Sequence, residues 1–430
     1  MSFNFKNPKI QKHMLEGYFG LEKESLRVTP QGFLAHTPHP FADNPNMERD
    51  FCENQTELIT NVTDSPEAVW KELASLQKKA VATLLNLKTG KELLWPFSNP
   101  PYVLGEKDIP IASYQGELHG KELYREYLAS KYGKRKMLFS GIHFNFSFSN
   151  ALLEEGYAES SLDTIREYKD SIYLELAKKV TRYSWLIVYL TAASSVMDGS
   201  FFRDEERGRI VLKNLASPRC SKIGYWNDFV PLLKYDTLQS YVESIESYVE
   251  QGQLKEAAEL YYPVRLKPAG ENTLEHLKNT GVNHIELRML DLNPLEPVGI
   301  RKDDLLFIHY FILYLMSLED GEFLPFEQTM AVRNEKSASK YEEQSIWIET
   351  GWNSCFPVRH AALQVLSAMN HFYEKFENKN ALFAIRFQEQ KIYCPEKRYA
   401  VQVRTLFRED YVKRGIAQAE KLAQELEFVI

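Results

Sequence analysis

Three short stretches of this chain alternate polar and apolar side chains, and longer segments with helical spacing separate them. The stretches are Gly20 to Val28, Ser140 to Ser149 and His284 to Leu290. Neighbouring side chains of a strand point to opposite faces, so this pattern predicts strands with one buried face. No glycine-rich strand-to-helix turn of the dinucleotide-binding type follows any of them. We therefore predict an α+β fold in which helices cover an antiparallel or mixed sheet.

Helical periodicity is clearest between Pro66 and Leu87, where apolar side chains recur every three or four residues. Leu162 to Ala193 and Leu238 to Tyr261 have a similar pattern. From Arg301 onward the chain is predicted to be mainly helical, and it ends in the charged segment Arg408 to Phe428. Long amphipathic helices of this kind bury one face against a sheet or against each other.

The charge and cysteine content of the chain limit which binding partners and which cell compartment are expected. The 430 residues carry 52 basic and 59 acidic side chains, a net charge of −7, so no basic surface for nucleic acid or an anionic membrane is expected. Small-molecule partners are expected instead, and nothing indicates an oligomeric state. The four cysteines form no C-x-x-C pair and no apolar signal segment is present, which favours a cytoplasmic protein. Without repeats or linkers, we expect one domain over 1–430, with the motifs in 1–300 and a helical part in 301–430.

Acidic residues gather in two of the early segments. Glu22 and Glu24 would project from the same face of their strand, where two carboxylates repel unless a cation neutralises them. The alternative is a pair of solvated acids at a sheet edge. Asp50 and Glu57 are an odd number of residues apart, so a bulge, a bend or helical spacing is needed to bring them together. The sequence leaves that choice open.

Two later strands carry polar groups on an apolar support. His143 and Asn145 share one face of their strand, and Glu286 and Arg288 share one face of theirs. A structural histidine and an ordinary cross-strand ion pair are the alternatives. Carboxylates, one histidine and arginines together favour magnesium chemistry on phosphate. Neither H-E-x-x-H nor a Walker A motif is present, so a zinc hydrolase is disfavoured and ATP would be held by another fold.

Taken in order, these motifs resemble the bacterial glutamate-cysteine ligase (γ-glutamylcysteine synthetase) family of the glutamine-synthetase-like superfamily. The matching runs cover roughly two thirds of the chain, which makes the resemblance more specific than any single motif. They are Gly20 to Val28, Asp50 to Thr60, Trp95-Pro96, Leu123 to Glu126, Ser140 to Ser147, Ser217 to Arg219, Gly224-Tyr225, Leu260 to Arg265, Ile285 to Arg288 and Asn293-Pro294.

The resemblance implies a glutamine-synthetase-like catalytic fold and a set of site residues. It implies a cluster of magnesium ions, with manganese as the alternative, and ATP as co-substrate. The implied metal ligands are Glu22, Glu24, Asp50, Glu57, His143 and Glu286. The implied catalytic arginines are Arg288, on the transferring phosphoryl group, and Arg219, and Glu53 is a candidate proton acceptor. The implied substrate contacts are Phe51, Tyr124, Arg125, Leu128, Asn145, Tyr225, Tyr261 and Arg265, with the aromatic and apolar members around cysteine.

The implied reaction is ATP-dependent ligation of the L-glutamate γ-carboxyl to the L-cysteine amine through γ-glutamyl phosphate, the first step of glutathione biosynthesis. No ATP-grasp extension follows in this sequence, so γ-glutamylcysteine is the expected product. A different amine acceptor is one alternative, because one methylene changes selectivity only about 10- to 200-fold. A non-catalytic regulatory or amino-acid-binding relative and a metal-dependent hydrolase are the others.

Overall fold

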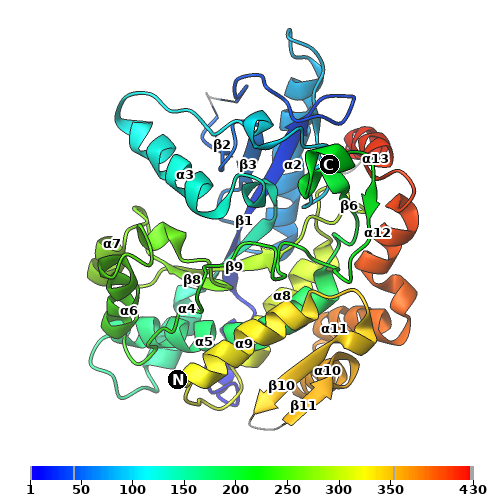
Figure 1. Ribbon diagram of the computed structural model, residues 1–430. Coiled ribbons are helices and arrows are strands. Elements are labelled where there is room, and N and C mark those ends of the chain that lie inside the picture. The colour runs from blue at the N-terminus through cyan, green and yellow to red at the C-terminus, as the bar shows by residue number, and fades with distance from the viewer. Residues whose placement is uncertain (1, 42–43, 352–353, 427–430) are drawn as a thin grey trace.

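A single large antiparallel sheet organises the computed structural model, which describes residues 2–41, 44–351 and 354–426. Its strand order is β2-β3-β1-β5-β9-β8, and β4 pairs with β1 (Figure 1). Every pairing in it is antiparallel, so of the two predicted sheet types the antiparallel one is found. The strands are β1 (Gly17–Val28), β2 (Met47–Arg49), β3 (Gln55–Ile59), β4 (Leu93–Leu94), β5 (Ile142–Phe148), β8 (Val264–Lys267) and β9 (His284–Leu290). The three predicted strands are β1, β5 and β9.

The register of the sheet brings the polar motifs together on one face. Glu24 lies opposite Glu57 and Glu22 lies opposite His143, across the two edges of β1. The next strand continues the row, since Asn145 lies opposite Glu286. Directly opposite residues in a sheet point to the same side, so these side chains share a face.

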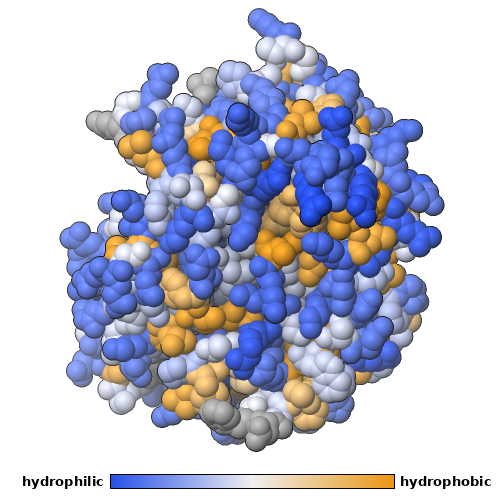
Figure 2. Space-filling model, in the orientation of Figure 1, coloured by the Kyte–Doolittle hydropathy of each residue, from blue (hydrophilic) through white to orange (hydrophobic). Residues whose placement is uncertain are grey.

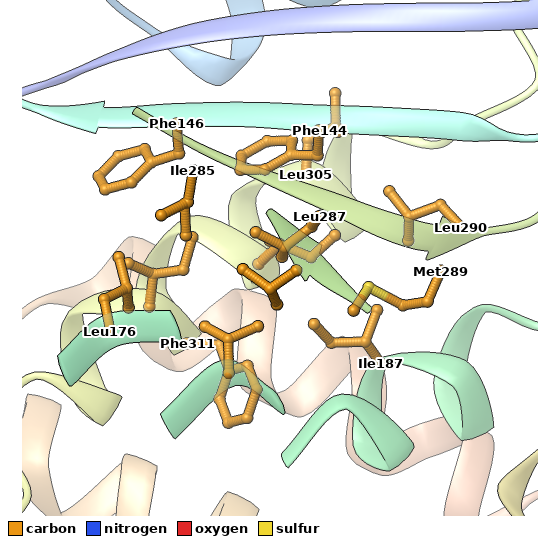
Figure 3. Close-up of a cluster of buried hydrophobic side chains, with 14 of the residues drawn as sticks. Phe144, Phe146, Leu176, Ile187, Ile285, Leu287, Met289, Leu290, Leu305 and Phe311 are labelled. Atoms are coloured by element: carbon orange, nitrogen blue, oxygen red, sulfur yellow. The ribbon is translucent and has the colours of Figure 1, made fainter. Parts of the chain in front are cut away.

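The other face of the sheet is the floor of the main hydrophobic core. Phe144 and Phe146 of β5 and Ile285 and Leu287 of β9 are fully buried there. Figure 3 shows these side chains pointing toward helices α5 (Ile165–Thr191) and α8 (Lys302–Leu315), which contribute residues such as Leu176 and Phe311. Burial of aromatic and aliphatic side chains at about 25 cal/mol per Å² makes this face a firm support for the polar one.

The predicted helices are present, with one change of length. Helix α2 (Pro66–Leu85) begins where Ser65 Oγ accepts the amide of Ala68 at 3.3 Å, and α5 has a capping box at Thr164. Helix α6 (Leu238–Glu250) is shorter than the predicted Leu238 to Tyr261. Gly252 follows it with φ of 70°, a left-handed conformation that ends the helix.

The C-terminal part is mainly helical, as predicted, and it wraps the sheet from the lower to the right-hand side of Figure 1. One element there was not predicted, a hairpin of β10 (Trp347–Gly351) and β11 (Ser354–Pro357). The predicted segment Arg408 to Phe428 contains α13, and residue 428 lies outside the described residues. The helices are α9 (Pro325–Ala338), α10 (Val358–Glu374), α11 (Lys379–Tyr393), α12 (Tyr399–Phe407) and α13 (Tyr411–Glu425).

Smaller elements complete the molecule. Helix α3 (His119–Tyr132) stands at the upper left of Figure 1. The others are α1 (Pro8–His13), α4 (Asn150–Tyr157), α7 (Leu274–Thr280), β6 (Met197–Asp198) and β7 (Ile210–Val211). Hydrophilic side chains cover most of the face in Figure 2, with apolar groups scattered between them. Among the described residues, no helix combines the length and apolarity needed to cross a bilayer.

Candidate active site

A cavity of about 280 Å³ opens over the polar face of the sheet. Its wall includes all six residues that the resemblance implied as metal ligands: Glu22, Glu24, Asp50, Glu57, His143 and Glu286. They come from β1, β3, β5, β9 and the turn after β2. The sheet therefore gathers at one place residues that are up to 264 positions apart in sequence.

The convergence of Asp50 and Glu57, which the sequence left open, results from a hairpin. Strands β2 and β3 pair with Glu48 opposite Glu57, and the amide of Asp50 donates to the Gln55 carbonyl at 3.0 Å. The chain reverses directly after Asp50. Asp50 thus reaches the cavity from the turn, while Glu57 reaches it from the strand.

His143 is the centre of the carboxylate cluster. Its Nδ1 lies 3.1 Å from Glu22 Oε2 and 3.2 Å from Glu286 Oε1, and its Nε2 lies 3.5 Å from Glu24 Oε1. Burial and the charge of Arg288 lower the pKa of His143, but hydrogen bonds to Glu22 and Glu286 outweigh them and raise it overall.

The carboxylates of the cluster differ in protonation tendency. Burial and the neighbouring charges of Glu22 and Asp50 raise the pKa of Glu57 well above its ordinary value. Burial alone would also raise the pKa of Glu286. The positive charges of Arg288 and Lys267 lower it well below the ordinary value instead. A cluster that carries this much repulsion is suited to a cation.

The donor set fits a hard divalent cation. Ligand atoms of Glu22, Glu57 and His143 all lie within 4.8 Å of one another. Carboxylate oxygens with one imidazole are ligands that magnesium and manganese accept, and both ions leave positions open for phosphate oxygens. Among the residues that the structure describes, this is the group whose geometry fits a metal site.

Two arginines border the cluster. Arg288 Nη1 donates to Glu286, its neighbour on the same face of β9. Arg219 Nη2 lies 3.4 Å from His143 Nε2, and its Nη1 donates to the Arg288 carbonyl. The Arg219 guanidinium packs on the Cα of Gly141, where a Cβ atom would collide with it. Glycine at this position therefore permits the close approach of the arginine.

An aromatic wall closes the cavity on the side of α3. It consists of the residues expected around cysteine: Phe51, Tyr124, Leu128, Tyr225 and Tyr261. The rings of Tyr225 and Tyr261 are 5.4 Å apart, and the buried Tyr124 hydroxyl has no hydrogen-bond partner among the described residues. An apolar recess with a free hydroxyl is suited to a small, partly apolar amino acid.

Two further predicted contacts, Arg125 and Arg265, line the cavity, but much of their donor capacity goes to the backbone. Arg125 Nε donates to the Asp50 carbonyl at 2.6 Å, and Arg265 Nη2 donates to the Leu260 carbonyl at 2.6 Å. Burial lowers the pKa of Arg265 to about 10. Both arginines therefore brace the loops of the wall.

Asn145 stands between this cavity and a second hollow. Its Nδ2 donates to Glu22 Oε1 at 2.9 Å. It lines an adjacent hollow of about 620 Å³ rather than the first cavity, and Glu22 lines both. Asn145 therefore orients the Glu22 carboxylate from the side of the second hollow.

Glu53 does not reach either space, which corrects the position expected for a proton acceptor. Its carboxylate accepts the backbone amides of His39 at 2.8 Å and Ser113 at 3.2 Å, and it pairs with Arg49 at 3.0 Å. These contacts lie on the outer side of the β2–β3 turn. Because Asp50 and Glu53 are three residues apart in a tight turn, they point in different directions.

Two charged residues of the cavity wall were missed by sequence reasoning. Lys267 of β8 lies with its Nζ 3.2 Å from Glu286 Oε2, and Glu335 reaches the cavity from α9. The alternation in β8, which places Arg265 and Lys267 on one face, was a signal that could have identified Lys267. Glu335 gave no such signal, because a glutamate followed by a lysine is ordinary on a helix surface.

Comparison with known proteins connects this geometry with one family. A family model described as glutamate-cysteine ligase matches residues 3–255 and 249–338. The glutathione biosynthesis bifunctional protein of Listeria monocytogenes is 38% identical over 438 residues, covering 98% of this chain and 56% of the relative. That of Clostridium perfringens is 35% identical over 396 residues, covering 88% and 50%. The chain thus spans about half the length of the curated relatives it matches.

Solved structures agree on the fold. A bifunctional glutathione synthetase from Pasteurella multocida superposes with a TM-score of 0.82 at 27% identity, covering 97% of this chain and 54% of that one. A glutamate-cysteine ligase from Francisella tularensis in complex with AMP gives 0.83 at 24% identity, covering 96% and 89%. The predicted α+β fold is therefore confirmed, and the chain shares it with these two solved structures.

Proposed function

Because this chain belongs to the glutamate-cysteine ligase family, we propose that it joins the γ-carboxyl of L-glutamate to the amine of L-cysteine at the expense of ATP. The observation that carries this proposal is the carboxylate–histidine cluster at the junction of two hollows, with Arg288 beside it. The names of the relatives, which refer to glutathione biosynthesis, support the same reaction. The proposed product is γ-glutamylcysteine.

A carboxylate is a poor electrophile, so the reaction requires activation by phosphate. In the proposed first step, the glutamate γ-carboxylate oxygen attacks the terminal phosphorus of ATP, and ADP leaves. Arg288 is in place to hold the transferring phosphoryl oxygens with its planar fork, and Glu286 fixes its orientation. Magnesium, when bound by the cluster, supplies positive charge for the phosphate oxygens and the carboxylates.

In the second step, the cysteine amine attacks the acyl carbon of γ-glutamyl phosphate. The C–N bond forms, the bond to phosphate breaks, and the amine loses a proton. The aromatic wall around Tyr225 and Tyr261 holds cysteine and excludes water, which would otherwise hydrolyse the acyl phosphate. We assign no proton acceptor, since Glu53 lies outside the cavity.

We place the nucleotide in the second hollow. Its volume of about 620 Å³ exceeds that of the first, and it reaches the cluster through Glu22. Lys169 and His284 on its wall provide positive charge or hydrogen-bond donors for phosphate. ATP in this hollow would present its terminal phosphate at the cluster, opposite the aromatic wall.

We also propose that residues 1–430 act as one catalytic domain. The main hydrophobic core contains side chains from Phe3 to Leu426, so the N-terminal motifs and the C-terminal helices share one interior. Glu335 of the C-terminal part reaches the cavity whose other walls come from earlier in the chain.

The test of the reaction is phosphate release from ATP with glutamate and magnesium, with and without cysteine, alongside the product mass. We expect phosphate release that depends on cysteine, with γ-glutamylcysteine formed. If phosphate were released only with another amine, the ligase mechanism would stand and the acceptor would be that amine instead of cysteine. Absence of release with every amine would reject the ligase proposal in favour of a non-catalytic relative.

A further inference from the structure

The wall of the first cavity contains polar groups to which the steps above give no role. One of them is Glu335 of α9, which is 3% exposed. Its Oε2 atom is buried and has no hydrogen-bond partner among the described residues. A buried carboxylate oxygen without a partner loses its hydration without replacement, which is costly unless a ligand supplies the missing contact.

Two unpaired donors lie near Glu335. The Nε atom of Arg219 and the Nε1 atom of Trp226 are both buried without a hydrogen-bond partner in the described part of the chain, and both residues line the cavity. Trp226 is adjacent to α9, because the Lys336 ammonium lies 4.2 Å from the centre of its ring. Arg219 and Glu335 line the same cavity.

One anionic acceptor and two N–H donors form the complement of an α-amino acid. A carboxylate binds an ammonium group, and guanidinium and indole N–H groups bind a carboxylate. We propose that Glu335 binds the α-ammonium group of the glutamate substrate and so selects an amino acid over a plain dicarboxylic acid. The proposal rests on the proposed function, whose γ-carboxyl donor it concerns.

The chemistry of the two substrates assigns Glu335 to glutamate rather than to cysteine. The α-ammonium of glutamate takes no part in the reaction and stays protonated. The cysteine amine must lose its proton to attack, so a carboxylate partner that holds it as ammonium would oppose the reaction. Arg219 Nη2 also lies 3.4 Å from His143 Nε2, so this group of side chains adjoins the cluster at which the γ-carboxyl would react.

Discrimination between L-glutamate and glutarate tests the assignment, because glutarate has both carboxyl groups but no ammonium. In the full chain, Glu335→Gln should raise KM for glutamate about 100-fold with a smaller change in kcat, since one partner of a buried charge pair is lost. Activity with glutarate should change less than about threefold, so that the preference for glutamate collapses. Glu327→Gln, on the same helix but paired with Arg182 outside this cavity, is the matched control.

Two outcomes overturn the inference. Equal losses with glutamate and glutarate would make Glu335 a structural group or the proton acceptor, and an unchanged glutamate KM would remove it from the site. Calorimetric binding of both acids, with magnesium and a non-hydrolysable ATP analogue but no cysteine, separates this from the wider proposal. Wild-type protein that binds no glutamate contradicts the proposed function, whereas equal binding by wild type and Glu335→Gln contradicts only the inference.

Discussion

Glu24 of β1 and Glu57 of β3 are direct cross-strand partners, with Glu24 buried and Glu57 half-buried at the edge of the cavity. Like charges at opposite positions of a sheet destabilise it. Burial and surrounding carboxylates raise the pKa of both groups. The pair therefore lowers stability unless positive charge is supplied, and this has a measurable consequence.

Replacement of Glu57 by Gln should separate stability from cation binding. In chelator, Glu57→Gln should melt at a higher temperature than wild type, by the equivalent of about 1 kcal/mol, because one like charge is removed. The gain in Tm on adding magnesium should be smaller than in wild type, because a ligand is lost. Glu48→Gln, opposite Glu57 on β2 but not on the cavity wall, is the control. An unchanged magnesium gain in Glu57→Gln would remove this residue from the metal site.

Arg288 should not tolerate a conservative change. We expect Arg288→Lys to lower turnover about 100-fold with an unchanged Tm, because an ammonium cannot replace a planar fork on phosphate and on Glu286. Steady-state kinetics and thermal melting measure the two quantities. Arg333→Lys, at an exposed pair with Glu349, should keep full activity. If Arg288→Lys turned over normally, its function would be structural.

Removal of the cluster centre should be more severe still. We expect His143→Ala and Glu286→Gln to abolish turnover, since each contacts several members of the cluster. Both variants should keep the secondary structure of the wild type, which circular dichroism measures. Near-normal activity in either variant would count against the assigned metal cluster.

Glu53→Gln tests the correction to the sequence-based assignment. Its carboxylate holds Arg49 and two backbone amides away from the cavity, so kcat should stay within about threefold of wild type. A modest loss of stability, about 1 to 2 kcal/mol, is expected in urea unfolding. A collapse of kcat with intact stability would return Glu53 to the reaction.

His309 should determine part of the stability at acid pH. It lies in α8 between the rings of Phe19 and Phe146, at 4.9 and 5.7 Å, and burial lowers its pKa to about 3. Below the ordinary value of 6.5 the unfolded chain takes up a proton that the folded chain does not, so stability falls as pH falls.

The corresponding variant is His309→Phe. Between about pH 8 and pH 5, wild type should lose about 2 kcal/mol more unfolding free energy than His309→Phe, because a histidine that stays neutral contributes about 1.4 kcal/mol per pH unit. The exposed His371→Phe should keep the wild-type pH dependence. Urea unfolding at both pH values measures this difference. If His309→Phe and wild type lost the same unfolding free energy between the two pH values, the assignment to His309 would be disproved.

Local patterns predicted the part of the fold that builds the cluster. Alternation placed Glu22, Glu24, His143 and Glu286 on polar faces, and the structure aligns those faces in one sheet. Pairing order is a long-range outcome, which the spacing of residues within a single strand cannot predict. The β2–β3 hairpin that positions Asp50 is local, but β2 has only three residues, too few for a periodicity to be recognised.

Several features of the structure depend on tertiary contacts or on local signals that the sequence analysis did not weigh correctly. Glu335 becomes a cavity residue only because α9 packs against α5, and nothing in its neighbours along the chain indicates burial. Helix α6 ends early because Gly252 adopts a left-handed conformation, a signal that was present but was outweighed by the apolar pattern beyond it. The β10–β11 hairpin is too short for a periodicity to be read.

The order of the strands in the sheet also has a consequence for biosynthesis. Strand β9 lies inside the sheet, between β5 and β8, yet Glu286 is made 264 residues after Glu22. A growing chain on the ribosome can therefore pair β1 with β3 before β9 is made, but it cannot yet form the site. The paired acids Glu24 and Glu57 come together before Arg288 exists to offset them. We expect folding to be slow and the site to be completed only after β9 has been made, with free magnesium in the cell as the early counter-charge.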